Sequence, residues 1–471
     1  MTMTLLGGEM LSWSDSAPAG SGLRPLAKTI SGRTLVAGPH TREFVAALPA
    51  DRVTVLLRGQ ADAETVAALG VPVWCGSLEK AAASPAFDTI VALDGLDRLC
   101  SVEAETLDGW DERLAHLLSM LRPGGRLLLA VENLFGLHRL LTPPRALTDD
   151  EWLVPDDRDP RRPAGLAALR DRLAGAGLSA EREYAAYGGA LLSRTLLADR
   201  DVSGFLTATL AGFHLENALA DPATLATRAL RHGLAADLAP SWVVIADRDT
   251  GGPETPEAVV DGRALSAGEL PRGRTLEDLL FVAAQQRDLP TMRTLLTRWQ
   301  KSPAAGVVAA QIVVVPPGDG TSLIPDGGDL IPLAAGGDPL VALRQFAAAA
   351  VEGDIAGLWP APADEAELTA LIAGMTGREV EPAAIPPRPP RTAPGAVREL
   401  TADRDRLARE LAEARARHEF YERQIRGRDA ELKRVRQINA VLSATAPGKA
   451  VLGGLKAGRR AVRAVVKRGR G

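Results

Sequence analysis

Two apolar stretches of the chain are each followed by polar residues of the types that can take a proton from a reacting hydroxyl. Carboxylates and imidazoles do this when they are held beside the acceptor oxygen. Ligands of open α/β sheets bind beyond the carboxyl ends of the strands, so residues at those ends are the first candidates. They are Asp94 and Asp97 after residues 87–93, and Glu132, Asn133 and His138 after residues 126–131.

We take Asp94, Glu132 and His138 as the candidate catalytic residues. A structural role stays open for each of them. Asp94 could cap the turn that follows it, and Glu132 could be a carboxylate favoured at the start of a helix. His138 could be an ordinary surface residue.

These candidates depend on a scaffold of alternating strands and helices. Continuous Leu/Val runs are typical of strands that are buried on both faces, and their alternation with helical segments predicts a parallel sheet with helices on both sides. The predicted strands are residues 33–37, 52–57, 71–74, 87–93 and 126–131, and the predicted helices between them are 41–48, 61–69 and 106–121.

Three segments of this scaffold carry a family resemblance. They are Phe87-Asp-Thr-Ile-Val-Ala-Leu93, Leu121-Arg-Pro-Gly-Gly-Arg-Leu-Leu-Leu129 and the helix Leu169–Gly177 before a sixth strand. Over residues 30–200 the chain resembles the class I S-adenosylmethionine-dependent methyltransferases. The resemblance implies a doubly wound seven-stranded sheet, S-adenosyl-L-methionine as cofactor and methyl transfer as activity. The Pro-Gly-Gly turn fits because glycine allows positive φ where a helix reverses into a buried strand.

The cofactor positions that the resemblance implies depart from the family pattern. The loop after the first strand has one glycine, Gly38, followed by His40. The second strand ends in Arg58 where the family has a ribose-binding acid, and Arg has no acceptor. Gly76 stands where an Asp often follows the third strand. The candidate cofactor-binding residues are therefore Gly38, His40, Arg58 and Gly76.

The same cations allow other interpretations. His40 and Arg58 could make a cationic pocket mouth that suits a phosphate-bearing ligand, or they could simply face water. We predict no metal site, because the chain has two Cys and six scattered His without the spacing of metal ligands.

Composition shifts divide the chain into six parts. We expect a poorly ordered leader, a methyltransferase-like domain, an accessory α+β region, a Pro-rich linker, a coiled-coil helix and a basic tail. Their predicted bounds are residues 1–30, 31–200, 201–380, 381–397, 398–445 and 446–471.

The helix near the C-terminus has a heptad pattern from Leu400 to Leu442, which predicts a homo-oligomer. A solitary charged helix is the alternative. The heptad a positions are Arg404, Leu411, His418, Ile425, Leu432 and Asn439, and the d positions are Leu400, Leu407, Ala414, Tyr421, Arg428, Val435 and Leu442.

Charge is distributed unevenly along the chain. The net charge is −4, yet eleven Lys or Arg and no acid follow Glu431. With Val and Leu between the cations from Lys449 onward, the tail indicates an anionic membrane surface, and a solvated basic tail is the alternative. Nucleic acid is disfavoured because the tail has no aromatic side chain for base stacking. The lack of a signal peptide predicts a cytoplasmic protein, and the basic tail predicts a peripheral location at the inner membrane face.

Two functional hypotheses follow. The first is a methyltransferase that O-methylates a sugar or an envelope-glycan precursor in polysaccharide biosynthesis. The second is a non-catalytic methyltransferase-fold scaffold that oligomerises through its coiled coil and sits at the membrane surface. The departures at Gly38, Arg58 and Gly76 favour the second.

Overall fold

The computed structural model describes most of the chain, and we treat its two compact units, residues 1–395 and 396–471, separately. The described residues are 3–11, 13–14, 19–20, 22–101, 109–142, 160–249, 251–316, 328–353, 355, 358, 364–387, 394–444, 453–460 and 463.

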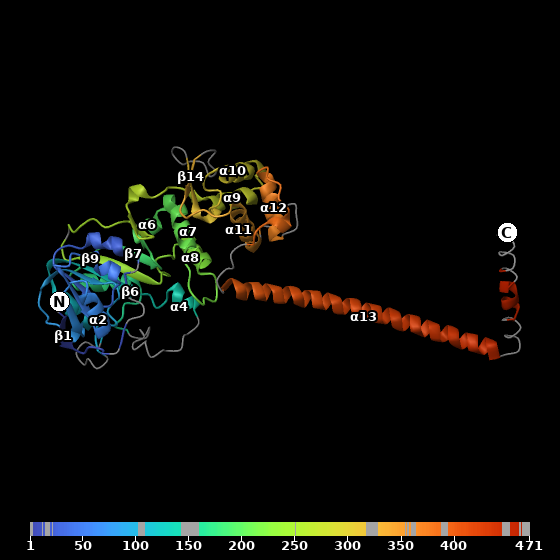
Figure 1. The fold of residues 1–471 in the computed structure, drawn as a ribbon, viewed down its shortest axis with the longest axis horizontal. Helices are drawn as coiled ribbons and strands as arrows, with labels where there is room; N and C mark the ends of the chain where they lie inside the picture. The colour runs from blue at the N-terminus through green and yellow to red at the C-terminus, as the bar shows by residue number, and fades with distance from the viewer. Residues whose placement is uncertain are drawn as a thin grey trace. The chain divides into compact units, whose positions relative to one another are not determined.

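The first unit is mixed α/β and is built on a large sheet (Figure 1). Eleven strands form the sheet in the order β1-β4-β3-β2-β5-β6-β9-β7-β8-β10-β11. Their bounds are β1 Met3–Gly7, β2 Thr34–Ala37, β3 Val53–Leu57, β4 Val73–Gly76, β5 Phe87–Ala92, β6 Leu121–Glu132, β7 Ser179–Tyr187, β8 Ala190–Ser193, β9 Ser241–Asp247, β10 Ala258–Val260 and β11 Arg263–Leu265.

Helices cover both faces of this sheet, as the sequence predicts. Leu127 and Leu129 of β6 pack into one core with helices α3 (Trp110–Ser119) and α5 (Leu166–Gly175), whereas Leu128 packs into the other with α1 (Arg42–Val45) and α2 (Gln60–Ala67). The five predicted strands are all present and pair in parallel. The helices of this part are α1 Arg42–Val45, α2 Gln60–Ala67, α3 Trp110–Ser119, α4 Leu137–Leu141, α5 Leu166–Gly175, α6 Arg194–Ala198, α7 Ser203–Ala211 and α8 Pro222–Arg231.

The strand count and the first domain boundary differ from the sequence prediction. The sheet has eleven strands rather than seven, and β9 lies in its middle, antiparallel to both β6 and β7. The sequence does indicate this strand, at residues 242–246, but a boundary at residue 200 assigns it to the accessory region. Because β9 belongs to the large sheet, the predicted boundary at residue 200 is wrong. Pairing between segments so far apart in the sequence leaves no local signal that could have placed the boundary correctly.

The predicted leader is also wrong for the residues that the structure describes. Strand β1 pairs in parallel with β4 at the edge of the sheet, and a short 3₁₀-helix spans Arg24–Thr29. Leu26 in that 3₁₀-helix is completely buried. Residues 3–11 and 22–30 are therefore part of the folded domain.

A second core forms the accessory α+β region. Three strands make its sheet, and Trp299 and Phe346 are buried among its helices. It begins near residue 274, which is later than predicted. Its elements are β12 Arg274–Thr275, β13 Ile312–Val315, β14 Asp329–Pro332, α9 Leu276–Gln285, α10 Leu289–Lys301, α11 Pro339–Glu352 and α12 Glu365–Met375.

The second unit contains one long helix, α13, which spans Pro394–Ala444. The predicted linker at 381–397 therefore ends in a helix, and residues 388–393 lie outside the described residues. Most of the basic tail also lies outside them, apart from the helical residues 453–460 and residue 463. Among the described helices, none is both long and apolar enough to cross a membrane.

Candidate functional site

The candidate site is the place where the strand order of the large sheet reverses. Strands β2 and β5 are parallel neighbours there, although β3 and β4 lie between them in the sequence. Doubly wound sheets bind ligands in the crevice beyond the carboxyl ends of such a strand pair. Gly38 follows β2 and Asp94 follows β5, so the fold brings these two predicted residues together.

Gly38 faces protein side chains at this crevice. Its φ is +90°, a value that favours glycine. A Cβ atom at Gly38 would lie 3.1 Å from Asp94 Cβ and 3.5 Å from Leu99 Cδ2. The close approach that a glycine permits is therefore used here by Asp94 and Leu99.

His40 joins the ends of β2 and β5 and presents neither ring nitrogen to the crevice. Its Nδ1–H donates to Gly38 O at 2.9 Å, and its Nε2 accepts from Leu93 N–H at 3.3 Å. Burial lowers the pKa of His40 to about 4, against the opposing effect of the Gly38 hydrogen bond. His40 is thus a neutral, structural residue.

Arg58 binds backbone carbonyls at the carboxyl end of β3. Its Nε donates to Gly8 O at 3.1 Å, and its Nη1 donates to Cys100 O at 2.8 Å. Burial lowers the pKa of Arg58, while the charge of Glu79 raises it. The Arg58 side chain holds residues 3–11, which we call the N-terminal segment, against the crevice. It does so in the place where the family resemblance implies a ribose-binding acid.

Backbone contacts hold the same N-terminal segment in place. Met10 N–H donates to Arg58 O at 2.8 Å, and Gln60 N–H donates to Met10 O at 3.1 Å. Gly76 has φ +149°, and a Cβ atom there would lie 2.6 Å from Gly7 O. A side chain at position 76 would collide with β1, so the pairing of β1 with β4 requires glycine there.

Little space remains in the crevice. Its lining includes Trp13, Pro39, Arg58 and Arg98, and the cavity volume is about 20 Å³. A single water molecule fills such a volume. Among the described residues, the cavity beside Arg58 has no room for S-adenosyl-L-methionine, and the carboxylate that lines it, Asp62, accepts a hydrogen bond from Ser14 Oγ at 2.5 Å.

The candidate catalytic carboxylates are engaged in ion pairs. Asp94 accepts from Arg98 Nε at 3.0 Å and also pairs with Arg98 Nη2. Asp97 binds Arg162 Nη1 through both oxygens, at 2.7 and 2.6 Å. Arg162 Nη2 also donates to Glu132 O at 3.4 Å, so this arginine links the carboxyl ends of β5 and β6.

Glu132 and His138 do form a pair, at the end of β6. His138 Nε2 lies 2.9 Å from Glu132 Oε1, and Arg139 Nε donates to the same oxygen at 2.8 Å. Burial raises the pKa of Glu132, but the hydrogen bonds from His138 and Arg139 outweigh it and lower the pKa to about 2. Glu132 therefore stays ionised.

The other ring nitrogen of His138 is turned into the protein. His138 Nδ1 is buried and has no hydrogen-bond partner among the described residues. A Cβ atom at Gly136 would lie 2.9 Å from it, so Nδ1 rests against this turn. Asn133 lies nearby but is structural, since its amide group bonds to Asp237 O and Ala239 O.

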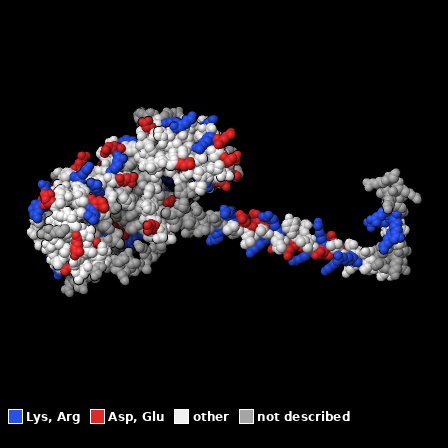
Figure 2. All heavy atoms as spheres, viewed as in Figure 1, with Lys and Arg blue, Asp and Glu red and all other residues white. Residues whose placement is uncertain are grey.

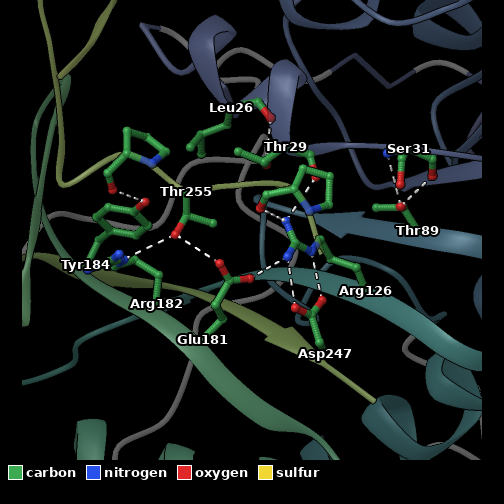
Figure 3. Close-up of polar contacts among 12 residues, drawn as sticks. Leu26, Thr29, Ser31, Thr89, Arg126, Glu181, Arg182, Tyr184, Asp247 and Thr255 are labelled. Carbon is green, nitrogen blue, oxygen red and sulfur yellow. Dashed lines mark hydrogen bonds and ion pairs between the residues drawn. The ribbon is translucent and has the colours of Figure 1, made fainter. Parts of the chain in front are cut away.

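A charged cluster surrounds Arg126, which is not among the residues predicted from the sequence (Figure 3). Its guanidinium binds Asp247 bidentately at 2.7 and 2.8 Å and also binds Glu181. Its Nη1 donates to Thr29 O at 3.2 Å and to Pro253 O at 2.9 Å, so all five N–H groups are used. The one signal was an Arg at the start of an otherwise apolar run.

This Arg126 cluster lies at the opposite edge from the crevice. Within β6, Arg126 begins the stretch that pairs with β9, and Glu132 ends it. Arg126 lies opposite Asp247, the last residue of β9. Burial and Asp247 raise the pKa of Glu181, although Arg126 opposes them. The cluster joins three strands and the 3₁₀-helix Arg24–Thr29 and has a structural role. Among the described residues, no group of three or more His, Cys, Asp or Glu is placed to hold a metal ion.

Comparisons with known proteins yield likenesses to solved structures alone. No family model matches the chain, and no curated protein does. A methyltransferase from Archaeoglobus fulgidus is 11% identical, with 48% of this chain and 91% of that chain covered and a TM-score of 0.28. The CcbJ methyltransferase of Streptomyces caelestis is 13% identical, with coverages of 50% and 92% and a TM-score of 0.28.

A third similar structure is the 1,6-didemethyltoxoflavin-N1-methyltransferase of Burkholderia thailandensis, which holds S-adenosylhomocysteine. It is 12% identical, with 49% of this chain and 79% of that chain covered and a TM-score of 0.25. At these values the likenesses carry no argument about what this chain binds or does.

Proposed function

We propose that this chain is a non-catalytic scaffold with a methyltransferase-like fold. The observation that carries the proposal is Arg58, whose guanidinium binds the Gly8 and Cys100 carbonyls at the carboxyl end of β3. With these bonds, and with the backbone hydrogen bonds that Met10 makes to Arg58 and Gln60, the cavity volume at the crevice is about 20 Å³. A nucleoside ligand would have to displace the N-terminal segment and leave a partly buried cation without its carbonyl partners.

Calorimetric titration of the full chain with S-adenosylmethionine and S-adenosylhomocysteine tests the proposal. We expect no binding heat at millimolar ligand. The variant Arg58→Asp supplies an acceptor and breaks the contact with Gly8, and Arg52→Asp, an exposed position just before β3, is its control. Binding at micromolar affinity by the unaltered chain would overturn the scaffold proposal.

One observation favours a second candidate, which is methyl transfer to a hydroxyl of a sugar or an envelope-glycan precursor. Glu132 and His138 form a carboxylate–imidazole pair 2.9 Å apart at the carboxyl end of β6. In this candidate Glu132 Oε2 is the general base, because His138 and Arg139 both bind Oε1 and His138 Nδ1 is buried. If this candidate is right, the chain will transfer labelled methyl groups to such acceptors, and Glu132→Gln will reduce the rate about a hundred-fold.

We also propose that the basic tail brings the scaffold to an anionic membrane surface at the cytoplasmic face. In the described segment 453–460, Lys456, Arg459 and Arg460 are exposed, and Leu455 is exposed beside them. Figure 2 shows Lys and Arg as the charged residues of this segment. Basic residues near an anionic bilayer with an apolar neighbour support this location.

A further inference from the structure

Helix α13 carries a stripe of exposed apolar side chains. Leu407, Leu411, Tyr421, Ile425, Leu432 and Val435 are each more than half exposed. Together with Ala414, His418 and Arg428 they recur at alternating spacings of four and three residues. A stripe of two positions in seven matches the narrow seam of a coiled coil rather than the wider face of a helix that packs on a globular core.

The charges beside the stripe indicate what covers it. With the apolar stripe at heptad positions a and d, Glu410, Arg417 and Glu431 occupy g positions. The e positions of the heptads that follow hold Arg415, Glu422 and Arg436. In a parallel coiled coil, each g residue meets the e residue of the partner helix five positions later.

A second copy of α13 in parallel register pairs these charges without conflict. It sets Glu410 beside Arg415, Arg417 beside Glu422, and Glu431 beside Arg436, twice each in the dimer. The remaining pair in the described part of the seam is Gln424 with Asp429, which is free of like charges. All six residues of the opposite-charge pairs are exposed.

An antiparallel pair of the same helices is less favourable. In that orientation g residues face g residues and e residues face e residues. In an antiparallel coiled coil a residues face d residues, and the register that sets His418 against Tyr421 places Glu410 beside Glu431, which is repulsive, and Arg415 beside Glu422, which is attractive. The next register, with Ile425 against Tyr421, places Glu422 beside its own copy. Each of these registers contains a repulsive contact, whereas the parallel register contains none. The charge pattern therefore selects the parallel orientation.

We propose that α13 binds a second copy of this chain as a parallel, in-register, two-stranded coiled coil. Asn439 at an a position favours two strands and fixes the register, at a cost in stability. Arg404, His418 and Arg428 at other seam positions lower the affinity further. The terminal seam positions Leu400 and Leu442 belong to the sequence pattern, and their side chains lie outside the described residues. The inference is independent of whether the crevice binds a cofactor.

Cross-linking of the full chain tests the orientation and the register. His418→Cys and Asn439→Cys each place one thiol at an a position, and the two native cysteines are buried. In a parallel dimer both variants form a disulfide with their own copy under mild oxidation, because equivalent a positions face each other. An antiparallel dimer cross-links at one of these positions at most. Cross-linking at only one, or at neither, overturns the proposal.

Charge exchange tests the pairing itself. The variant Glu410→Lys plus Glu431→Lys and the variant Arg415→Glu plus Arg436→Glu each turn four attractive contacts of the dimer into repulsive ones. We expect each variant alone to dimerise about a hundred-fold more weakly than the native chain, and their equimolar mixture to regain native affinity. Sedimentation equilibrium measures both. A native chain that stays monomeric, or variants that dimerise as tightly as the native chain, would refute the parallel dimer.

Discussion

At the scale of single residues, the candidate site is built of side chains whose polar atoms bind one another. His40 uses both ring nitrogens within the fold, Arg58 binds two carbonyls, and Asp94 pairs with Arg98. Residue types and positions at strand ends singled out Gly38 and Asp94 separately, and the fold places the two side by side. Residue types could not predict the partners of Arg58, because Gly8 and Cys100 come from segments far away in the sequence.

The low pKa of His40 predicts a pH dependence of stability. A folded-state pKa of about 4 lies below the ordinary value of 6.5, so the unfolded chain binds the proton first as pH falls. The free energy of unfolding should therefore decrease by about 3 kcal/mol between pH 6.5 and pH 4 on account of His40, and this residue adds no pH dependence above pH 7. Denaturant titrations at several pH values measure it.

In His40→Gln this pH-dependent part should be absent, whereas His116→Gln, a partly exposed histidine on α3, should keep it. Glu132 also contributes a loss of stability below about pH 4.5, because its pKa of about 2 lies below the ordinary value of 4.5, but this loss is the same in both variants and cancels in their comparison. An unchanged slope in His40→Gln would show that other groups cause the pH dependence.

Arg126 predicts a large structural effect away from the crevice. Arg126→Met leaves Asp247 and Glu181 without their cation, so the free energy of unfolding should drop by about 3–5 kcal/mol. Arg122 is on the same strand as Arg126 and makes a half-exposed ion pair with Asp88 of β5. Arg122→Met removes this pair and should lower the free energy of unfolding by about 1 kcal/mol or less. Urea denaturation distinguishes the two, and equal losses would contradict the structural role of Arg126.

At the scale of elements, local pattern predicted the five parallel strands and the strand at residues 242–246, but not where this last strand pairs. Its insertion between β6 and β7 joins residues more than a hundred positions apart. Strand β1 was missed for a related reason. Its residues have no strong pattern of their own, and pairing with β4 is what orders them.

The contact between β1 and Gly76 gives a prediction at this scale. Gly76→Ala should detach β1, because a Cβ atom there would lie 2.6 Å from Gly7 O. Gly70→Ala is the control, with φ +84° and no atom within 4 Å of the added methyl group. Amide exchange of Met3–Gly7 should become fast in Gly76→Ala alone. Equal exchange in both variants would show that backbone strain, rather than the clash, decides the result.

At the scale of the whole molecule, the proposed function combines a closed α/β domain, a dimerising helix and a basic tail. The sequence indicated the helix and the tail directly, since heptads and runs of charge are local patterns. It could not decide between enzyme and scaffold, because that choice depends on how the N-terminal segment packs beside Arg58.

The tail predicts binding to anionic vesicles. Each basic residue near such a surface contributes about 1 kcal/mol, screened by salt, and a parallel dimer presents two tails at high effective concentration. Deleting residues 449–471 should release the chain from vesicles and leave the dimer intact. The charge variants of α13, which dimerise more weakly, should also bind vesicles more weakly, although the variant Glu410→Lys plus Glu431→Lys gains positive charge. Cosedimentation at low and physiological salt checks this, and a chain that stays in the supernatant at both contradicts it.

The central claim is that the N-terminal segment closes the crevice at the end of β3. Amide hydrogen exchange of Met10 and Gln60 tests it most directly, because Met10 N–H donates to Arg58 O and Gln60 N–H donates to Met10 O. We expect slow exchange of these amides in the full chain and no change when millimolar S-adenosylhomocysteine is added. Fast exchange of Met10 and Gln60 without ligand, or a change confined to these amides with ligand, would contradict it.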